Sequence, residues 1–365
     1  MKNNTKYTSA TLAGCANQHY FESDGSMRVS RAFFKIFSGG EAEYCLLFSG
    51  RMDGSYRRIS LHDEECSNWK ITSARVAHCR SMRSDLPPEE LSRESDFEIG
   101  EWHTLTFSGE ESKAAEPGLF SSDPIRLNIS TGEYLCLELR YFGERIPCHP
   151  ECIIPIYEWD GVRWKYSVNM PLPCMIGSDR PVGGRVAFLG DSITQGVGTP
   201  VNGYSHWNAL LAEKLGHGYS YWNLGIGYGK ISDVASDGIW LSKAKTCDTV
   251  FLCFGVNDIN GDYGADTIKA DLYRTVTLLR EAGCRIILQT TPPYDYPENR
   301  RLVWCQVNDY ITGELSSLAD RLFDVRPVLS KSPEEPHKTR FEGHPNEEGC
   351  ALWADALYDA VKDMF

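Results

Sequence analysis

The chain has 365 residues, a net charge of −13 at pH 7 and 42% hydrophobic residues. This length exceeds what one hydrophobic core usually supports, so we expect two domains. The acidic balance, without a basic cluster, argues against binding to nucleic-acid phosphates or to an anionic membrane surface. We therefore expect a neutral or small partner.

The N-terminal residues 1–7 lack the apolar core of a signal peptide, and no stretch approaches the ~18 apolar residues of a membrane span. Thirteen cysteines are scattered singly through the chain, which is typical of reduced thiols packed as small apolar groups. The tightest group is Cys148-His149-Pro150-Glu151-Cys152, with Cys174 further on. Zinc sites prefer tighter and repeated spacing, so we expect no metal. The missing signal-peptide core and the reduced thiols predict a cytoplasmic location.

Residues 1–180 carry short apolar runs and no convincing long helix. An Asp160-Gly161 pair between two such runs predicts a hairpin with a two-residue turn. The spacing of the runs predicts an antiparallel β-sandwich domain of jelly-roll type. Residues 81–97, which contain two prolines and several charges, are expected to form a surface excursion. The predicted strands are 32–37, 44–48, 57–61, 70–77, 104–107, 125–129, 134–141, 153–159 and 162–166.

Residues 170–184 contain three prolines and a Gly-Gly pair, which is typical of a linker. We therefore divide the chain into domains 1–180 and 181–365. Strands and helices alternate in the second domain, which predicts a mostly parallel sheet. Predicted strands are 186–189, 219–224, 249–254, 285–290 and 322–325, and a helix over 204–215 is expected to end at Gly216. Asn346 is expected to cap the last helix.

The predicted strand 186–189 is followed directly by Gly190-Asp191-Ser192. Open α/β sheets bind ligands at this place, just past the carboxyl ends of their strands. A serine nucleophile needs a base within hydrogen-bond reach and donors for the oxyanion. A serine that only caps a helix would give the same local pattern, so the interpretation depends on matching blocks downstream. Three such blocks are present: Asn223-Leu224-Gly225-Ile226-Gly227, Phe254-Gly255-Val256-Asn257-Asp258 and Gly343-His344-Pro345-Asn346.

Together the four blocks resemble the SGNH (GDSL-type) hydrolase family over roughly residues 185–365. The resemblance implies a flavodoxin-like three-layer α/β/α domain and a serine esterase that needs neither a metal nor an organic cofactor. It implies that Ser192 is the nucleophile and that His344 accepts its proton. It also implies an oxyanion hole formed by the Ser192 N–H, the Asn257 side chain and an amide of the second block.

The N-terminal half is similar to the β-rich modules of some SGNH carbohydrate esterases. That similarity implies an accessory role in shaping the cleft, although a sandwich that only stabilises the fold is an equal alternative. The expected substrate is a small ester with a short acyl or acetyl group, and an acetylated carbohydrate is one candidate within this class. Asp191 and Asp258 are expected to tie loops together rather than to take part in catalysis.

The sequence departs from the family pattern at two positions. The family glycine of the second block lies five residues after the asparagine, where this chain has Tyr228. We favour Gly227 as the donor and keep the Tyr228 N–H as the alternative. The family aspartate three residues before the histidine is replaced by Phe341. Glu342, a carboxylate from another loop or a backbone carbonyl in a Ser–His dyad could orient His344.

Two other functions stay open at this point. A protein that has lost activity with the missing aspartate could keep the fold and bind carbohydrate. The glycine-rich turn 225–229 could bind a nucleotide, but its spacing is not GxGxxG. The sequence does not indicate the oligomeric state.

Overall fold

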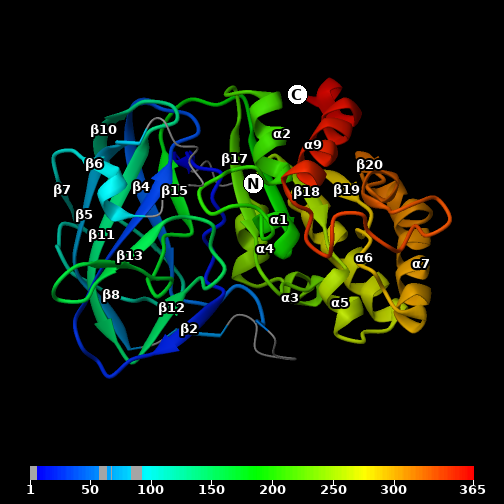
Figure 1. Ribbon diagram of the computed structural model, residues 1–365, viewed down its shortest axis with the longest axis horizontal. Coiled ribbons are helices and arrows are strands. Elements are labelled where there is room, and N and C mark those ends of the chain that lie inside the picture. Colours follow the sequence, from blue (N-terminus) through cyan, green and yellow to red (C-terminus); the bar gives the residue numbers. More distant parts are fainter. Residues whose placement is uncertain (1–5, 57–63, 67, 84–92) are drawn as a thin grey trace.

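The computed structural model describes residues 6–56, 64–66, 68–83 and 93–365 (Figure 1). The predicted strand 57–61 and most of the predicted surface excursion 81–97 lie outside the described residues. The chain folds into an antiparallel β-rich half followed by an α/β half, and the two lie side by side (Figure 1). None of the described helices combines the length and the apolar composition needed to span a membrane.

The N-terminal half consists of antiparallel sheets, as predicted. One sheet has the order β1-β15-β4-β10 with β9 on β4, and another has the order β14-β13-β3-β11-β5-β6 with β7 and β8 on β5. A separate pair joins β12 to β2. Side chains of the two larger sheets share one buried core. The strands are β1 (Thr8–Ser9), β2 (His19–Glu22), β3 (Arg28–Lys35), β4 (Gly40–Ser49), β5 (Trp69–Ser81), β6 (Phe97–Ile99), β7 (His103–Leu105), β8 (Lys113–Ala114), β9 (Leu119–Ser121), β10 (Ile125–Ile129), β11 (Tyr134–Gly143), β12 (Arg145–Cys148), β13 (Ile156–Trp159), β14 (Trp164–Tyr166) and β15 (Met175–Ser178).

The predicted hairpin at Asp160-Gly161 forms, but the prediction of a two-residue turn is wrong. Trp159 pairs with Trp164, so four residues connect β13 to β14. The Asp160 carboxylate accepts hydrogen bonds from the N–H groups of Val162 and Arg163 at 2.8 and 2.9 Å. These bonds stabilise the longer loop, in which Gly161 takes the left-handed conformation (φ 96°).

The C-terminal half contains a five-stranded parallel sheet with the order β17-β16-β18-β19-β20. This is the flavodoxin-like order, in which the chain reverses direction across the sheet next to β16. The strands are β16 (Arg185–Gly190), β17 (Ser220–Gly225), β18 (Thr249–Cys253), β19 (Arg285–Gln289) and β20 (Arg321–Phe323). The helices are α1 (Ser192–Gln195), α2 (Trp207–Leu215), α3 (Ile231–Ala235), α4 (Ile239–Ala244), α5 (Val256–Asn260), α6 (Ala265–Glu281), α7 (Glu298–Thr312), α8 (Arg326–Leu329) and α9 (Glu347–Val361).

Helices cover both faces of this sheet, so alternate strand residues pack in two different cores. Phe188 packs in one core with the α2 and α9 side chains, whereas its neighbours Ala187 and Leu189 pack in the other with α3, α4, α6 and α7. The α6 stripe of Ile268, Leu272, Val276 and Leu279 is buried as predicted. Asn346 caps α9 by accepting the Gly349 N–H at 3.0 Å. The three-layer α/β/α prediction is therefore confirmed.

The interface between the two halves is polar in places and fully buried there. Asp53 and Lys243 form an ion pair of 2.6 Å whose side chains are both 0% exposed. The Trp222 indole N–H donates to the Cys174 carbonyl oxygen at 2.8 Å.

Twelve of the thirteen cysteines are buried, and all are free thiols. The predicted boundary at 180/181 falls between β15 and β16.

Candidate active site

Ser192 is the first residue of α1 and stands directly beyond the carboxyl end of β16. Asp191 caps this short helix, because its carboxylate accepts the Ile193 N–H at 3.0 Å. A methyl group added at Gly190 would lie 2.0 Å from Thr194 Oγ1 and 2.7 Å from the Cys253 carbonyl oxygen. Only glycine fits this turn, which leaves Ser192 8% exposed at the end of the sheet.

The fold brings His344 to Ser192 across 152 positions of sequence. His344 Nε2 lies 2.8 Å from Ser192 Oγ. Two glycines permit this approach: a methyl group at Gly198 would lie 2.8 Å from His344 Cβ, and one at Gly343 would lie 2.6 Å from the Tyr294 ring. The Tyr294 ring meets the imidazole edge-on, with the ring centroids 6.0 Å apart. Packing therefore fixes the position of the imidazole.

Burial lowers the pKa of His344 below its usual value, and no charged group contributes to the shift. A lowered pKa keeps the imidazole neutral near pH 7, which is the state that accepts a proton from a serine hydroxyl. In the part of the chain that the structure describes, the bond to Ser192 is the only hydrogen bond of this ring. The arrangement is therefore a Ser–His pair without a carboxylate partner.

Glu342 is not brought into contact with His344. Its side chain is exposed, its backbone is left-handed (φ 62°), and it forms no hydrogen bond or ion pair with a described residue. Phe341, at the family aspartate position, is 7% exposed and packs against Gly349, where an added methyl group would lie 2.8 Å from its ring. Of the three alternatives for orienting His344, the one through Glu342 thus has no support in the geometry.

Asn257 lies in α5, shortly after Gly255, which takes the left-handed conformation with φ 119°. Its side-chain amide donates to the Gly229 carbonyl oxygen at 3.0 Å. A carboxamide NH₂ has two donors. Among the described residues the second one has no partner, so Asn257 is able to hold the loop after β17 and to donate to a ligand as well.

Gly227 has its amide already engaged. Its N–H donates to Gln195 Oε1 at 2.6 Å, and Gln195 is fully buried. A methyl group at Gly227 would lie 1.8 Å from Glu151 Oε2 and 2.3 Å from Gln18 Nε2, so the N-terminal domain requires a glycine here. The next residue, Tyr228, has φ 60°, a conformation that usually favours glycine. The geometry therefore weighs against Gly227 and leaves the Tyr228 amide as the alternative donor.

Close packing also explains the other glycines of this turn. A methyl group at Gly225 would lie 2.1 Å from the Gln195 backbone nitrogen, and one at Gly229 would lie 2.6 Å from the Trp240 ring. No ligand is needed to account for the glycine-rich sequence.

Asp191 and Asp258 hold backbone amides rather than the reacting groups. Burial raises the pKa of each carboxyl group to about 7. Asp258 accepts the Ile231 N–H at 3.1 Å, and neither carboxylate is hydrogen-bonded to Ser192 or His344. Both are therefore structural supports of the site's loops. Among the described residues, no group of three or more His, Cys, Asp or Glu side chains is arranged to hold a metal ion.

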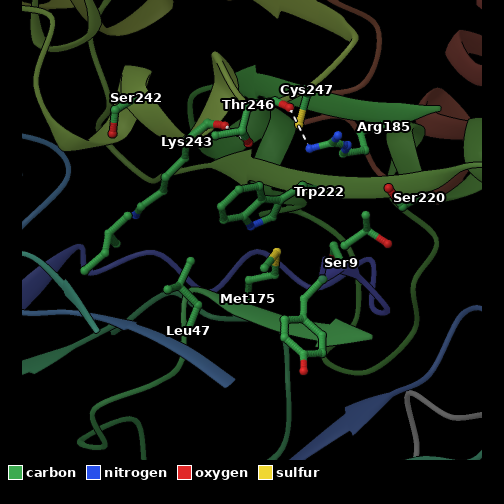
Figure 2. Close-up of a pocket in the computed structure, with 13 residues that line it drawn as sticks. Ser9, Leu47, Met175, Arg185, Ser220, Trp222, Ser242, Lys243, Thr246 and Cys247 are labelled. Carbon is green, nitrogen blue, oxygen red and sulfur yellow. Dashed lines mark hydrogen bonds between the residues drawn. The ribbon is translucent and has the colours of Figure 1, made fainter. Parts of the chain in front are cut away.

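Two cavities lie at opposite ends of the strands of the parallel sheet, one at their carboxyl ends and one at their amino ends. A cavity of about 440 Å³ adjoins His344 and is lined in part by Val197, Tyr294, Phe341 and Asn346. A second cavity of about 240 Å³ lies between the two domains (Figure 2), where Leu47 and Met175 face Trp222. Arg185 and Ser220, the first residues of β16 and β17, also line it, so it opens at the end of the sheet away from Ser192.

Gln195 and Tyr294 were not among the residues predicted from the sequence. Gln195 lies one helical turn after Ser192 and bonds both domains: Oε1 accepts the Gly227 amide, and Nε2 donates to the Glu151 carbonyl oxygen. Its place in the first turn after the nucleophile was a usable signal. Tyr294 lies after β19 in the Thr-Thr-Pro-Pro-Tyr segment, and the carboxyl end of a parallel strand was a reason to consider it.

Comparison with known proteins adds to this geometry. Residues 188–352 match the family model described as the GDSL-like Lipase/Acylhydrolase family. This domain belongs to that family. It is thus a domain of carboxylic ester hydrolases, and the predicted family resemblance is confirmed. No curated protein matches the chain by sequence.

Solved structures of similar proteins cover about half of this chain. A putative lipolytic protein of the G-D-S-L family from Desulfitobacterium hafniense is 18% identical, with 48% of this chain and 98% of that chain covered and a TM-score of 0.41. The esterase EstA from Pseudoalteromonas is 16% identical, with coverages of 49% and 97% and a TM-score of 0.39. The acetyl xylan esterase AlAXEase is 24% identical, with coverages of 48% and 99% and a TM-score of 0.40.

Proposed function

We propose that this protein hydrolyses small esters with a short acyl group through an acyl-Ser192 intermediate. The observation that carries the proposal is the 2.8 Å contact between Ser192 Oγ and a partly buried His344 imidazole at the carboxyl end of β16. A hydroxyl paired with a neutral imidazole is the activated form of a serine nucleophile.

In the first step, His344 Nε2 takes the Ser192 proton while Oγ attacks the ester carbonyl carbon. The oxyanion is bound by the Ser192 N–H, the Tyr228 N–H and the second N–H of the Asn257 side chain. His344 then returns the proton to the departing alcohol oxygen as the acyl-enzyme forms. In the second half, His344 takes a proton from water, the hydroxide attacks the acyl carbon, and Ser192 recovers its proton as the carboxylic acid leaves.

The pair works here without a carboxylate. Packing by Gly198, Gly343 and Tyr294 holds the ring, and burial keeps it neutral before attack. The imidazolium formed during the reaction is stabilised by the oxyanion formed with it, since the two charges are close together.

Acetylated carbohydrates are the first esters to test within this class. The proposal rests on the combination of an SGNH-type site with an N-terminal β-sandwich, which resembles the arrangement of SGNH carbohydrate esterases. Acetylated mono- and oligosaccharides should be compared with p-nitrophenyl esters of increasing acyl length. A preference for acetyl groups and a preference for sugars are separate outcomes of that comparison.

The decisive experiment is trapping of the acyl-enzyme. Rapid mixing with p-nitrophenyl acetate should give a burst of p-nitrophenol that matches the enzyme concentration, and a fluorophosphonate should modify Ser192 in the folded protein. Modification at another residue, or none, would refute the proposal.

A further inference from the structure

The loop between β17 and α3, residues 226–230, is here called the donor loop because it carries the Tyr228 amide. We propose that Ser55 of the N-terminal domain is a positioning residue that fixes the donor loop for catalysis. This inference rests on the proposed esterase function. It assigns the N-terminal domain a part in the reaction through a named hydrogen-bond network.

Ser55 is 2% exposed and uses its backbone and its hydroxyl across the domain interface. Its Oγ accepts a hydrogen bond from Lys230 Nζ at 2.8 Å and donates one to Asp233 Oδ2 at 3.2 Å. Its backbone N–H donates to the same carboxylate oxygen at 3.3 Å. One hydroxyl thus joins a buried ammonium group to a buried carboxylate. Water could take the place of this hydroxyl beside the two charges only if the interface opened.

Those two charged residues determine where the donor loop ends. Lys230 is its last residue and also the N-cap of α3, and its backbone N–H donates to Asp233 Oδ2 at 3.1 Å. Asp233 therefore ties together the end of the loop, the start of the helix and Ser55. The neighbouring Gly54 packs on the same segment, since a methyl group there would lie 3.5 Å from Ile226 Cγ2.

The middle of the donor loop is held by two residues of the C-terminal domain, one of which also bonds the N-terminal domain. Gln195 accepts the Gly227 amide and donates to the Glu151 carbonyl oxygen, while Asn257 donates to the Gly229 carbonyl oxygen. Tyr228 lies between these attachments in a left-handed conformation that is costly for a tyrosine. The network around Ser55 contributes to keeping that conformation in place.

An oxyanion donor must be held within about 0.5 Å of its productive position. Loss of the Ser55 hydroxyl leaves Lys230 and Asp233 with one partner fewer in a buried place, so the end of the donor loop shifts. Because the Tyr228 amide acts on the oxyanion and not on the bound ester, the expected change is in kcat rather than in KM.

The test compares Ser55→Ala with Ser38→Ala in the full chain. Ser38 is a matched control, because it is 7% exposed and its Oγ lies 3.2 Å from His217 Nδ1 of the C-terminal domain, away from the donor loop. With p-nitrophenyl acetate, Ser55→Ala should lower kcat about 10-fold, a small fraction of the loss of a whole donor, with KM within about 2-fold. Ser38→Ala should change neither constant by more than about 2-fold.

Active-site titration with the acetate burst corrects kcat for any unfolded fraction, and Ser55→Thr, which keeps the hydroxyl, should restore kcat. If Ser55→Ala does not fold, the milder Ser55→Cys takes its place, because a thiol is only a weak donor. Equal kcat values for the Ser55 and Ser38 variants after titration would overturn the positioning role. If Ser192→Ala hydrolysed the ester as fast as the parent, the proposed function itself would fail, whatever the Ser55 variants do.

Discussion

The carboxyl edge and the amino edge of the parallel sheet are the sides at which its strands end and begin. The same strands form both, and the two differ in the segments that leave or enter each strand. At the carboxyl edge, Ser192, Asn257 and the Tyr228 amide stand in short turns after β16, β18 and β17. Two of these turns hold left-handed residues, Tyr228 at φ 60° and Gly255 at φ 119°. The left-handed conformation is strained for Tyr228, and such strain is kept only where the surroundings fix it.

The amino edge holds the interdomain cavity (Figure 2), and several polar groups around it are hydrogen-bonded within the protein. Trp222 donates to the Cys174 carbonyl oxygen, and Thr246 donates to the Lys243 carbonyl oxygen, at 2.8 and 2.7 Å. The remaining walls are largely apolar, including Leu47 and Met175. The reactive groups therefore come from the segments that follow the strands, since the same strands carry the Ser192–His344 pair at one edge and only packing contacts at the other.

The strongest test of this difference is a pair of serine substitutions, one at each edge. Ser192→Ala removes the nucleophile and should lower kcat about 10⁴-fold or more. Ser220→Ala, at the first residue of β17 and 5% exposed, should leave kcat and KM within about 2-fold. Steady-state hydrolysis of p-nitrophenyl acetate measures both. A comparable loss in the two variants would show that the edges are not distinct.

Asn257→Ala should have the next largest effect. The substitution removes an oxyanion donor together with the 3.0 Å bond to the Gly229 carbonyl oxygen. Loss of one such donor typically lowers kcat about 10²- to 10³-fold. Thermal unfolding of the variant should be measured beside the kinetic assay. If unfolded protein accounts for the whole loss of kcat, the assignment of Asn257 to the oxyanion hole is wrong.

The pH dependence should show a smaller, graded effect. His344 must be neutral to accept the Ser192 proton, and burial lowers its pKa below 6.5. As the pH falls through that lowered pKa the imidazole becomes charged, so kcat/KM should fall about tenfold per pH unit below a midpoint lower than about 6.5.

Asp191→Asn distinguishes this assignment from titration of a neighbouring carboxyl group. The pKa of Asp191 is raised to about 7. If titration of Asp191 caused the acidic limb of the kcat/KM profile, that limb would have its midpoint near 7 and would disappear in the variant. A limb that stays below the ordinary histidine pKa of 6.5 in Asp191→Asn belongs to His344.

The sheet was predictable because it depends on local patterns, and the Ser192–His344 pair was predicted through the resemblance of the four sequence blocks to a known family. Apolar runs mark buried strands, and Gly190-Asp191-Ser192 breaks such a run at a place where only a turn fits. What speaks against Gly227 as the donor could not be read from the sequence: its amide is bound by Gln195, and its α-carbon is covered by Glu151 from the other domain. Contacts between residues so distant in sequence leave no periodic signal. The family pattern, with its glycine five residues after the asparagine, nevertheless kept Tyr228 as the alternative donor.

Glu342→Gln should have the smallest effect and is the most informative about the histidine. The chain places a carboxylate two residues before His344, which made it a reasonable partner from sequence. The left-handed backbone of Glu342 and its exposed side chain instead leave it without contact to the ring. We therefore expect kcat within about 2-fold of the parent, since a carboxylate that does not touch the imidazole cannot orient it. A loss of about tenfold or more in kcat would show that Glu342 reaches His344 during the reaction and that the site is a triad.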